Sequence, residues 1–292
     1  MNKGGMEKKH EWFVTLPSFV WLLLFFLIPT CIIFIYALKS QDIYGGIEPG
    51  WSLEAISNLF DKDYTLLIFR TLMISAITTA VCILLALPVG YQMAIAPKRF
   101  RKLLILMLML PFWTSFLIRI FAWKALLHPE GFFNNLLAFL HIISPNTTLL
   151  YHLGAVLLVT IYTYLPFAIF PIYAAASKFN FQLFEAAMDL GASRSQAFLK
   201  VFLPGISKGI STGAMMVFIS TTGAYIIPDL VGGFDSEMIG TRIAQKVFVE
   251  RNLPEASALS ILLALVVFLP LLAITMFSSR PKKLELELRN KE

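Results

Sequence analysis

Residues 178–204 read KFNFQLFEAAMDLGASRSQAFLKVFLP. The first half has the period of an amphipathic helix, because Phe181, Phe184, Ala187 and Met188 fall on one face and polar residues occupy much of the other. A plain connecting loop would be polar throughout. The apolar face therefore needs a cover, which is a docked partner, the lipid headgroups or the rest of the chain.

The second half of this segment indicates a turn and another short helix. Gly191 is a natural helix stop, because glycine adopts the left-handed conformation that ends many helices. Ser193 follows as a candidate N-cap, and Pro204 is expected to end the second helix. The segment, taken as residues 178–205, is thus predicted to be a helix–turn–helix.

On both sides of this segment lie long apolar stretches, each with the length of about 20 residues or more that a membrane span needs. Their apolarity is continuous and does not alternate as in a strand, which favours helices. We predict an all-α integral membrane protein with six transmembrane helices in one domain, residues 1–292. The spans cover about 12–38, 71–96, 103–127, 149–177, 206–228 and 254–279. Residues 131–140 are apolar but too short to span, and are expected to form an interfacial helix.

Composition agrees with a membrane protein. Of 292 residues, 58% are hydrophobic and only 14% are charged, where soluble domains carry about a quarter. Such a chain has too much apolar surface for an ordinary soluble enzyme. Cys31 and Cys82 lie inside apolar runs, and their spacing fits neither a disulfide framework nor a metal site.

The net charge of +6 is divided unevenly between the two sides of the predicted membrane. One side holds 16 basic and 7 acidic residues, in the two tails, residues 98–102 and residues 178–208. The other side holds 8 basic and 11 acidic residues, in residues 39–70, 119–148 and 229–255. Basic flanks remain in the cytoplasm. We therefore expect a multi-pass protein with cytoplasmic N- and C-termini. The charge sets orientation against the lipid bilayer, so no nucleic-acid partner is needed.

The loop also carries a motif. Glu185-Ala186-Ala187, Gly191 and the ending Leu203-Pro204 resemble the cytoplasmic loop of binding-protein-dependent ABC importer permeases, the MetI-like family, with Val201 in place of the usual Ile. The resemblance implies a MetI-like permease fold in a bacterial inner membrane. It also implies that these six residues form the coupling helix that contacts the ATP-binding subunit.

The implied partners are two ABC ATPase subunits, a second permease subunit and an external binding protein. This chain has no G-x-x-x-x-G-K-[ST] phosphate loop, so the resemblance implies that ATP is hydrolysed by a separate polypeptide. We expect a non-catalytic transport subunit with no cofactor, no bound metal and no catalytic residue.

Residues 110–123, LPFWTSFLIRIFAW, together with the later segment 228–240, resemble the spermidine/putrescine permeases, more closely the B-type subunit than its C-type paralogue. The resemblance implies transport of polyamines, which favour carboxylates and aromatic faces. Candidate pathway residues are Trp113, Tyr162, Tyr225, Asp229 and Glu237. A helix end at the membrane surface is the simpler explanation of Asp229, and interfacial anchoring or packing within the bundle is the simpler explanation of the aromatic residues.

Other functions are compatible with parts of the sequence. Within the same family the alternative substrates are Fe(III), thiamine and an opine. An ion-coupled secondary transporter is disfavoured, because the middle of each span lacks a carboxylate or lysine. An intramembrane enzyme is disfavoured too, because the four histidines are scattered and form no H-E-x-x-H.

Overall fold

The computed structural model describes residues 15–42, 45–141, 143–144 and 148–278, and the side chains among them up to residue 268. Within these ranges the regular elements are helices, and the only strand-like pairing is one isolated bridge between Gln41 and Ile47. The prediction of an all-helical chain is confirmed.

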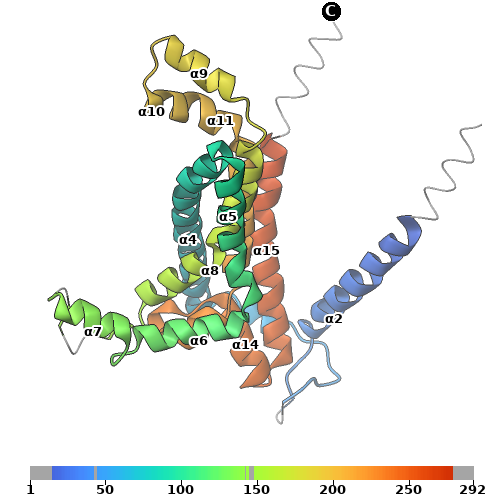
Figure 1. Ribbon diagram of the computed structural model, residues 1–292. Coiled ribbons are helices and arrows are strands. Elements are labelled where there is room, and N and C mark those ends of the chain that lie inside the picture. The colour runs from blue at the N-terminus through green and yellow to red at the C-terminus, as the bar shows by residue number, and fades with distance from the viewer. Residues whose placement is uncertain (1–14, 43–44, 142, 145–147, 279–292) are drawn as a thin grey trace, which may run out of the picture. The chain divides into compact units, whose positions relative to one another are not determined.

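The helices follow one another with short connections (Figure 1). The first half contains η1 (Leu23–Leu27), α2 (Ile28–Tyr36), α3 (Glu54–Asn58), α4 (Lys62–Ile95), α5 (Lys98–Met109), η2 (Leu110–Trp113), α6 (Phe116–Leu127) and α7 (Phe132–Phe139). The second half contains α8 (Leu153–Ala176), α9 (Phe181–Asp189), α10 (Arg194–Ala197), η3 (Phe198–Phe202), α11 (Leu203–Gly205), α12 (Ser207–Thr222), α13 (Ile226–Val231), η4 (Phe234–Ser236), α14 (Ile239–Phe248) and α15 (Leu253–Ser278).

Three helical stretches among the described residues are long and apolar enough to cross a membrane: Thr15–Tyr36, Lys62–Ile95 and Leu153–Ala176. Two bent pairs pass the same test when each is taken together, and Leu253–Phe268 is a shorter apolar helix. Each predicted span therefore overlaps an apolar helix or a bent pair. The number of crossings stays a prediction.

The third predicted span, 103–127, is not one straight helix. The stretch Lys98–Trp113 meets Phe116–Phe139 at 90°. The break falls where Pro111 ends the regular hydrogen bonding and where Thr114 and Ser115 adopt extended backbone conformations. The fifth predicted span, 206–228, is also interrupted, because α12 ends at Thr222 and α13 begins only at Ile226.

The chain divides into two compact units, of which the smaller comprises Met1–Thr65 and Arg242–Phe268. Its apolar centre is built from the small residues Ala37, Ala55 and Ala258. A polar network lies beside them: buried Glu255 accepts hydrogen bonds from Tyr64 and Asn252, and Lys246 Nζ lies 2.9 Å from its Oε2.

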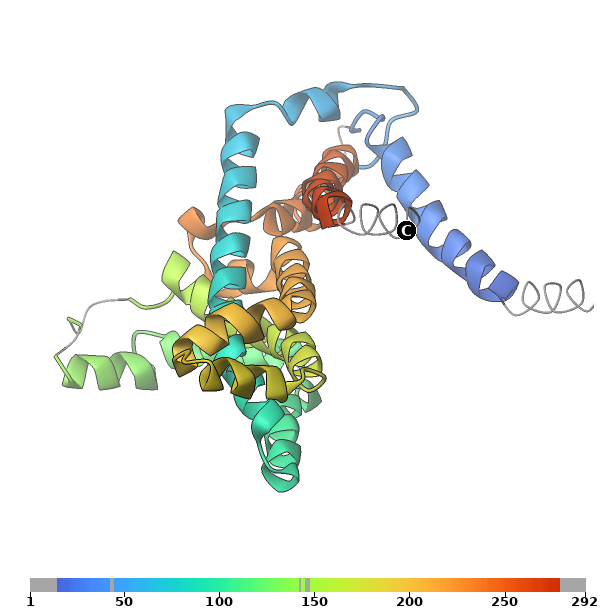
Figure 2. The ribbon, with the colours of Figure 1, turned by 90° about the horizontal axis from the view of Figure 1, so that it is seen from above.

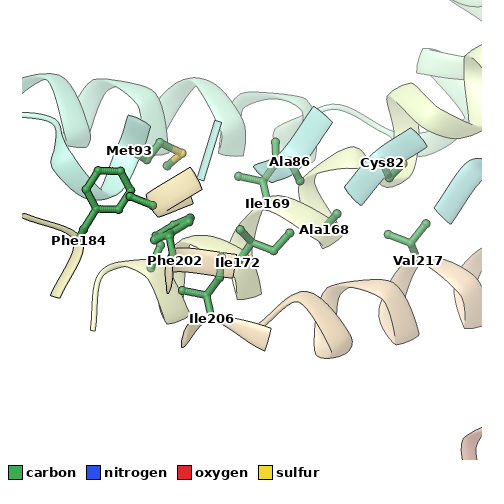
Figure 3. Close-up of a cluster of buried hydrophobic side chains, with 12 residues drawn as sticks. Cys82, Ala86, Met93, Ala168, Ile169, Ile172, Phe184, Phe202, Ile206 and Val217 are labelled. Atoms are coloured by element: carbon green, nitrogen blue, oxygen red, sulfur yellow. The ribbon is translucent and has the colours of Figure 1, made fainter. Parts of the chain in front are cut away.

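The larger unit comprises Leu66–Thr241 and Leu269–Glu292. Its core is formed by α4, α8 and α12 (Figure 3). Glycines permit the close approach of α12 to α8, because a Cβ on Gly209 would lie 2.4 Å from that of Ala175 and one on Gly213 would lie 3.1 Å from the Ala168 carbonyl oxygen. Such small-residue contacts are a common way for membrane helices to associate.

Candidate functional site

Segment 178–205 forms a helical hairpin beyond the ends of α4 and α8 (Figure 1). Its first helix, α9, starts at Asn180, whose side chain accepts a hydrogen bond from Gln182 N at 3.1 Å. It ends in a Schellman motif, in which Gly191 N donates to Met188 O at 2.9 Å and Ala192 N donates to Ala187 O at 3.0 Å. Gly191 has φ +91°, so the predicted glycine stop is confirmed.

The second arm of the hairpin begins at a capping box. Ser193 Oγ accepts from Gln196 N at 3.3 Å, and Gln196 Oε1 accepts from Ser193 N at 3.0 Å. The predicted N-cap is therefore confirmed. The helix ends slightly later than predicted, because α11 continues through Pro204 to Gly205 before the chain bends by 72° into α12. Proline is tolerated there because it occupies the first positions of a new helical turn, where an N–H partner is not required.

The apolar face of the hairpin packs on the protein itself. Tyr91, near the end of α4, has its ring centre 5.1 Å from that of Phe202, 5.5 Å from Phe198, and 6.1 and 6.2 Å from Phe184 and Phe181. Phe184 and Phe202 are buried. Of the three covers that the sequence allowed, the rest of the chain is thus the one observed for these aromatic rings. Figure 2 shows α9 and α10 lying across α4 from above.

Tyr91 was missed by sequence reasoning, because it lies inside an apolar run with no motif around it. The only signal is an aromatic residue with a polar tip close to the basic cluster that begins at Lys98. We call Tyr91 and the phenylalanines that contact it, Phe181, Phe184, Phe198 and Phe202, the Tyr91 cluster.

A groove of about 720 Å³ opens between the hairpin and the end of α4. Tyr91, Phe181, Phe184 and Phe198 of the Tyr91 cluster line it together with Glu185, Arg194 and Leu199. Leu199 is 60% exposed, and Leu190, which does not line the groove, is 89% exposed, so apolar surface of the hairpin remains uncovered.

The other predicted coupling residues lie on the hairpin but do not line this groove. Ala186 is exposed on α9, Ala187 is half-buried against the core, Leu203 is half-buried and Pro204 is exposed. The structure thus gathers the predicted motif on one hairpin, with Glu185 at the groove.

The second candidate region surrounds α13. Asp229 is exposed in the first turn of this helix, and its N–H donates to the carbonyl oxygen of Tyr225 at 3.0 Å. Tyr225 is 42% exposed, so these two candidate pathway residues lie one turn apart on the surface.

Tight packing holds the segment that follows Asp229. A Cβ on Gly232 would lie 2.4 Å from the Pro228 carbonyl oxygen, and one on Gly233 would lie 2.2 Å from that of Tyr151. A Cβ on Gly240 would likewise lie 2.7 Å from the Ala224 carbonyl oxygen. The glycines in the polyamine-permease-like segment therefore fix the backbone around Tyr225 and Asp229.

The remaining candidates are not gathered at Asp229. Trp113 is 74% exposed at the end of η2, and the Tyr162 ring packs edge-on against Trp123 at 5.2 Å. Glu237 is half-buried between η4 and α14. Among the described residues, no group of three or more His, Cys, Asp or Glu side chains is arranged to hold a metal ion.

The fold and the hairpin define the class of protein. Residues 83–282 match the family of binding-protein-dependent transport system inner membrane components, and the chain belongs to that family. It is accordingly an inner-membrane transport component with the MetI-like permease fold, as the sequence predicted.

Its relatives are more specific. The chain is 34% identical over 254 residues to the spermidine/putrescine transport system permease protein PotB of Haemophilus influenzae, covering 86% of this chain and 89% of that protein. It is 32% identical over 268 residues to PotB of Escherichia coli, covering 91% and 98%. A crystal structure of a bacterial ABC transporter that imports alginate shares the fold, with a TM-score of 0.73 at 21% identity, covering 94% of this chain and 98% of the other.

Proposed function

We propose that this chain is the permease subunit of an ATP-driven ABC importer that carries spermidine and putrescine into the cytoplasm. The assignment of the substrate rests on the 32–34% identity to PotB proteins along nearly the whole chain. The exposed carboxylate of Asp229 beside Tyr225 is consistent with a cationic substrate, since a carboxylate and an aromatic face both attract ammonium groups.

The motor is a pair of ATPase subunits that dock on the α9–α10 hairpin. The hairpin offers the charges of Glu185 and Arg194 and uncovered leucines to a partner. This mixture of an apolar centre with a charged rim is typical of protein interfaces. Glu185 is placed to pair with a basic side chain of the ATPase, and Gly191 sets the turn that presents it.

Movement of the hairpin reaches the membrane helices through the Tyr91 cluster. A push on α9 is transmitted to α4, because the rings of Phe181 and Phe184 contact Tyr91 directly. These ring contacts make the position of α9 depend on that of α4, because a displacement of one helix without the other would separate the rings and lose their contact energy. The hairpin thus couples nucleotide-driven motion to the spans.

The complete importer contains a second permease subunit, a paralogue of the C-type, and an external polyamine-binding protein that delivers the substrate. Both termini of this chain lie in the cytoplasm, on the side of the hairpin. The uneven charge distribution along the sequence supports this orientation.

Uptake of labelled spermidine by cells that carry the complete transporter, with and without this subunit, tests the function. We expect uptake to be lost without the subunit and to be blocked by excess unlabelled putrescine. Equal uptake in both strains would refute the polyamine assignment. Normal uptake and normal co-purification of the ATPase with a Gly191→Arg variant would instead refute the coupling role of the hairpin.

A further inference from the structure

An apolar pocket of about 510 Å³ lies among α6, α7 and the start of α8. Figure 1 shows α6 and α7 extending beside the first turns of α8. The walls are formed chiefly by aromatic and aliphatic side chains, among them Trp123, Leu127, Phe133, Leu137 and Leu158. Water is poorly stabilised in such a cavity, because a bound water molecule needs two to four polar hydrogen-bond partners.

The pocket has a rigid aromatic wall. The rings of Trp123 and Phe133 are stacked with centres 6.1 Å apart and planes 7° apart, and Tyr162 packs against the other side of Trp123. The side chains of Thr148 and His152 supply the polar part of the lining. A preformed apolar slot with a polar edge fits an amphiphile better than a compact polar solute.

Its position is the end of a helix that can cross the membrane. Gly154, Ala155 and Leu158 of the lining belong to the first two turns of α8, which is one of the three candidate spans. The neighbouring α7 turns Phe132 and Phe139 outward, with exposed fractions of 65% and 79%. Aromatic residues gather at this level of the bilayer, where the acyl chains meet the headgroups.

A cation directly follows Trp123, one of the residues that line the pocket. Lys124 follows Trp123 on α6 and is half-buried, with its Nζ 6.0 Å from the centre of the Tyr151 ring. It makes no ion pair with any carboxylate in the described part of the chain. Its charge is therefore available to a phosphate at the mouth of the apolar slot.

From this arrangement we propose that the pocket binds one acyl chain of a membrane phospholipid, whose phosphate group is held by Lys124. The bound chain fills the space between α6, α7 and the first turns of α8. The lipid is thus a structural ligand of this permease, separate from its transported substrate.

Gly154 offers a way to block the site without disturbing the fold. No atom lies within 4 Å of the position that its Cβ would take, so a larger side chain there projects into open space at the pocket wall. Leucine is also a better helix former than glycine. Gly50→Leu is the matched control, because Gly50 has equally open surroundings and lies outside this pocket.

The test uses the assembled transporter in liposomes that contain a phospholipid with a photoactivatable group near the end of one acyl chain. After illumination, labelled peptides are mapped by mass spectrometry. We expect adducts on α6, α7 and the start of α8. These adducts should fall severalfold in Gly154→Leu and stay at the wild-type level in Gly50→Leu.

Unchanged labelling of these peptides in Gly154→Leu would overturn the proposal. Labelling that appears in the isolated chain but not in the assembled transporter would also overturn it, since the second permease subunit would then cover the pocket. If Gly154→Leu does not assemble, Lys124→Gln in the same liposomes decides: severalfold weaker labelling supports the phosphate contact, and equal labelling contradicts it.

Discussion

Removing the ring of Tyr91 should uncouple ATP hydrolysis from transport. Tyr91 is half-buried and contacts four phenylalanines of the hairpin, so Tyr91→Ala deletes the centre of the cluster that joins α4 to α9 and η3. Truncating a buried aromatic residue to alanine costs about 3–5 kcal/mol, and the lower end applies to a half-buried ring. A loss of about 3 kcal/mol lowers the equilibrium constant for packing of the hairpin on α4 by roughly a hundredfold.

The assay is purified transporter in liposomes, with spermidine uptake and ATP hydrolysis measured on the same preparation. Because Glu185, Arg194 and Leu199 remain, the ATPase still binds, whereas its motion no longer reaches α4. We expect uptake to fall more than hydrolysis, so that the number of ATP molecules consumed per spermidine rises severalfold. Tyr91→Phe keeps the ring and should behave nearly as the wild type.

Leu84→Ala is the matched control on the same helix, because Leu84 is 71% exposed and lies away from the hairpin. A double-mutant cycle between Tyr91→Ala and Phe202→Ala should give a coupling energy of about 0.5–1.5 kcal/mol, the usual value for an aromatic pair. The reasoning is refuted if Tyr91→Ala assembles normally and keeps the wild-type ratio of ATP to spermidine.

Four further outcomes are expected. Gly191→Ala should weaken co-purification of the ATPase, because a φ of +91° strains the backbone of a residue with a side chain by about 1–2 kcal/mol. Gly191→Asn should restore much of the co-purification, because asparagine tolerates positive φ better than alanine. Equal amounts of co-purified ATPase with glycine, alanine and asparagine at position 191 would contradict this. Asp229→Asn should reduce spermidine uptake without altering assembly, and unchanged uptake would make Asp229 a simple helix residue. Gly209→Ala should lower the melting temperature of the transporter by several degrees, because its Cβ meets that of Ala175, while Gly154→Ala should not. Although burial alone would lower the pKa of Lys246, its hydrogen bonds to Glu250 and Glu255 raise it. The stability that this network contributes is therefore fully present below the usual lysine pKa and is lost as the pH rises above about 10.5. Across this alkaline range the melting temperature should fall less steeply with pH in Lys246→Met.

Much of the hairpin could be predicted because its signals are local. Asn180, Gly191 and Ser193 act on backbone groups within a few residues, so a sequence motif is enough to place the caps. What local pattern could not decide was the cover of the apolar face. That answer depends on Tyr91, about 90 residues earlier than Phe181 in sequence, and periodicity contains no information on such a pairing.

The elbow within 103–127 shows a different limit. Hydropathy averages over a window of about 20 residues and reports a single apolar stretch there. The direction of the chain is set instead by the backbone at Thr114 and Ser115, which turns α6 by 90°. Pro111 was visible in the sequence, but proline is common in membrane helices and does not by itself distinguish a kink from a right-angled turn.

The candidate substrate pathway was the hardest part to foresee. The segment around Pro228–Gly233 was recognised, and its glycines do pack closely enough to fix Tyr225 and Asp229. Aromatic rings attract cations, but interfacial and core aromatics share this property, so it does not identify Trp113 or Tyr162 as a pathway residue. In the structure, Tyr162 packs on Trp123, a partner from another helix that the sequence could not specify.

The most direct test of the central claim is spermidine uptake into liposomes that contain this permease, its partner permease and the ATPase, with the external binding protein supplied in the surrounding solution. We expect uptake only when ATP is available to the ATPase, and a loss of that uptake when Glu185 is replaced by alanine. Spermidine uptake that follows an imposed proton or sodium gradient without ATP would contradict it.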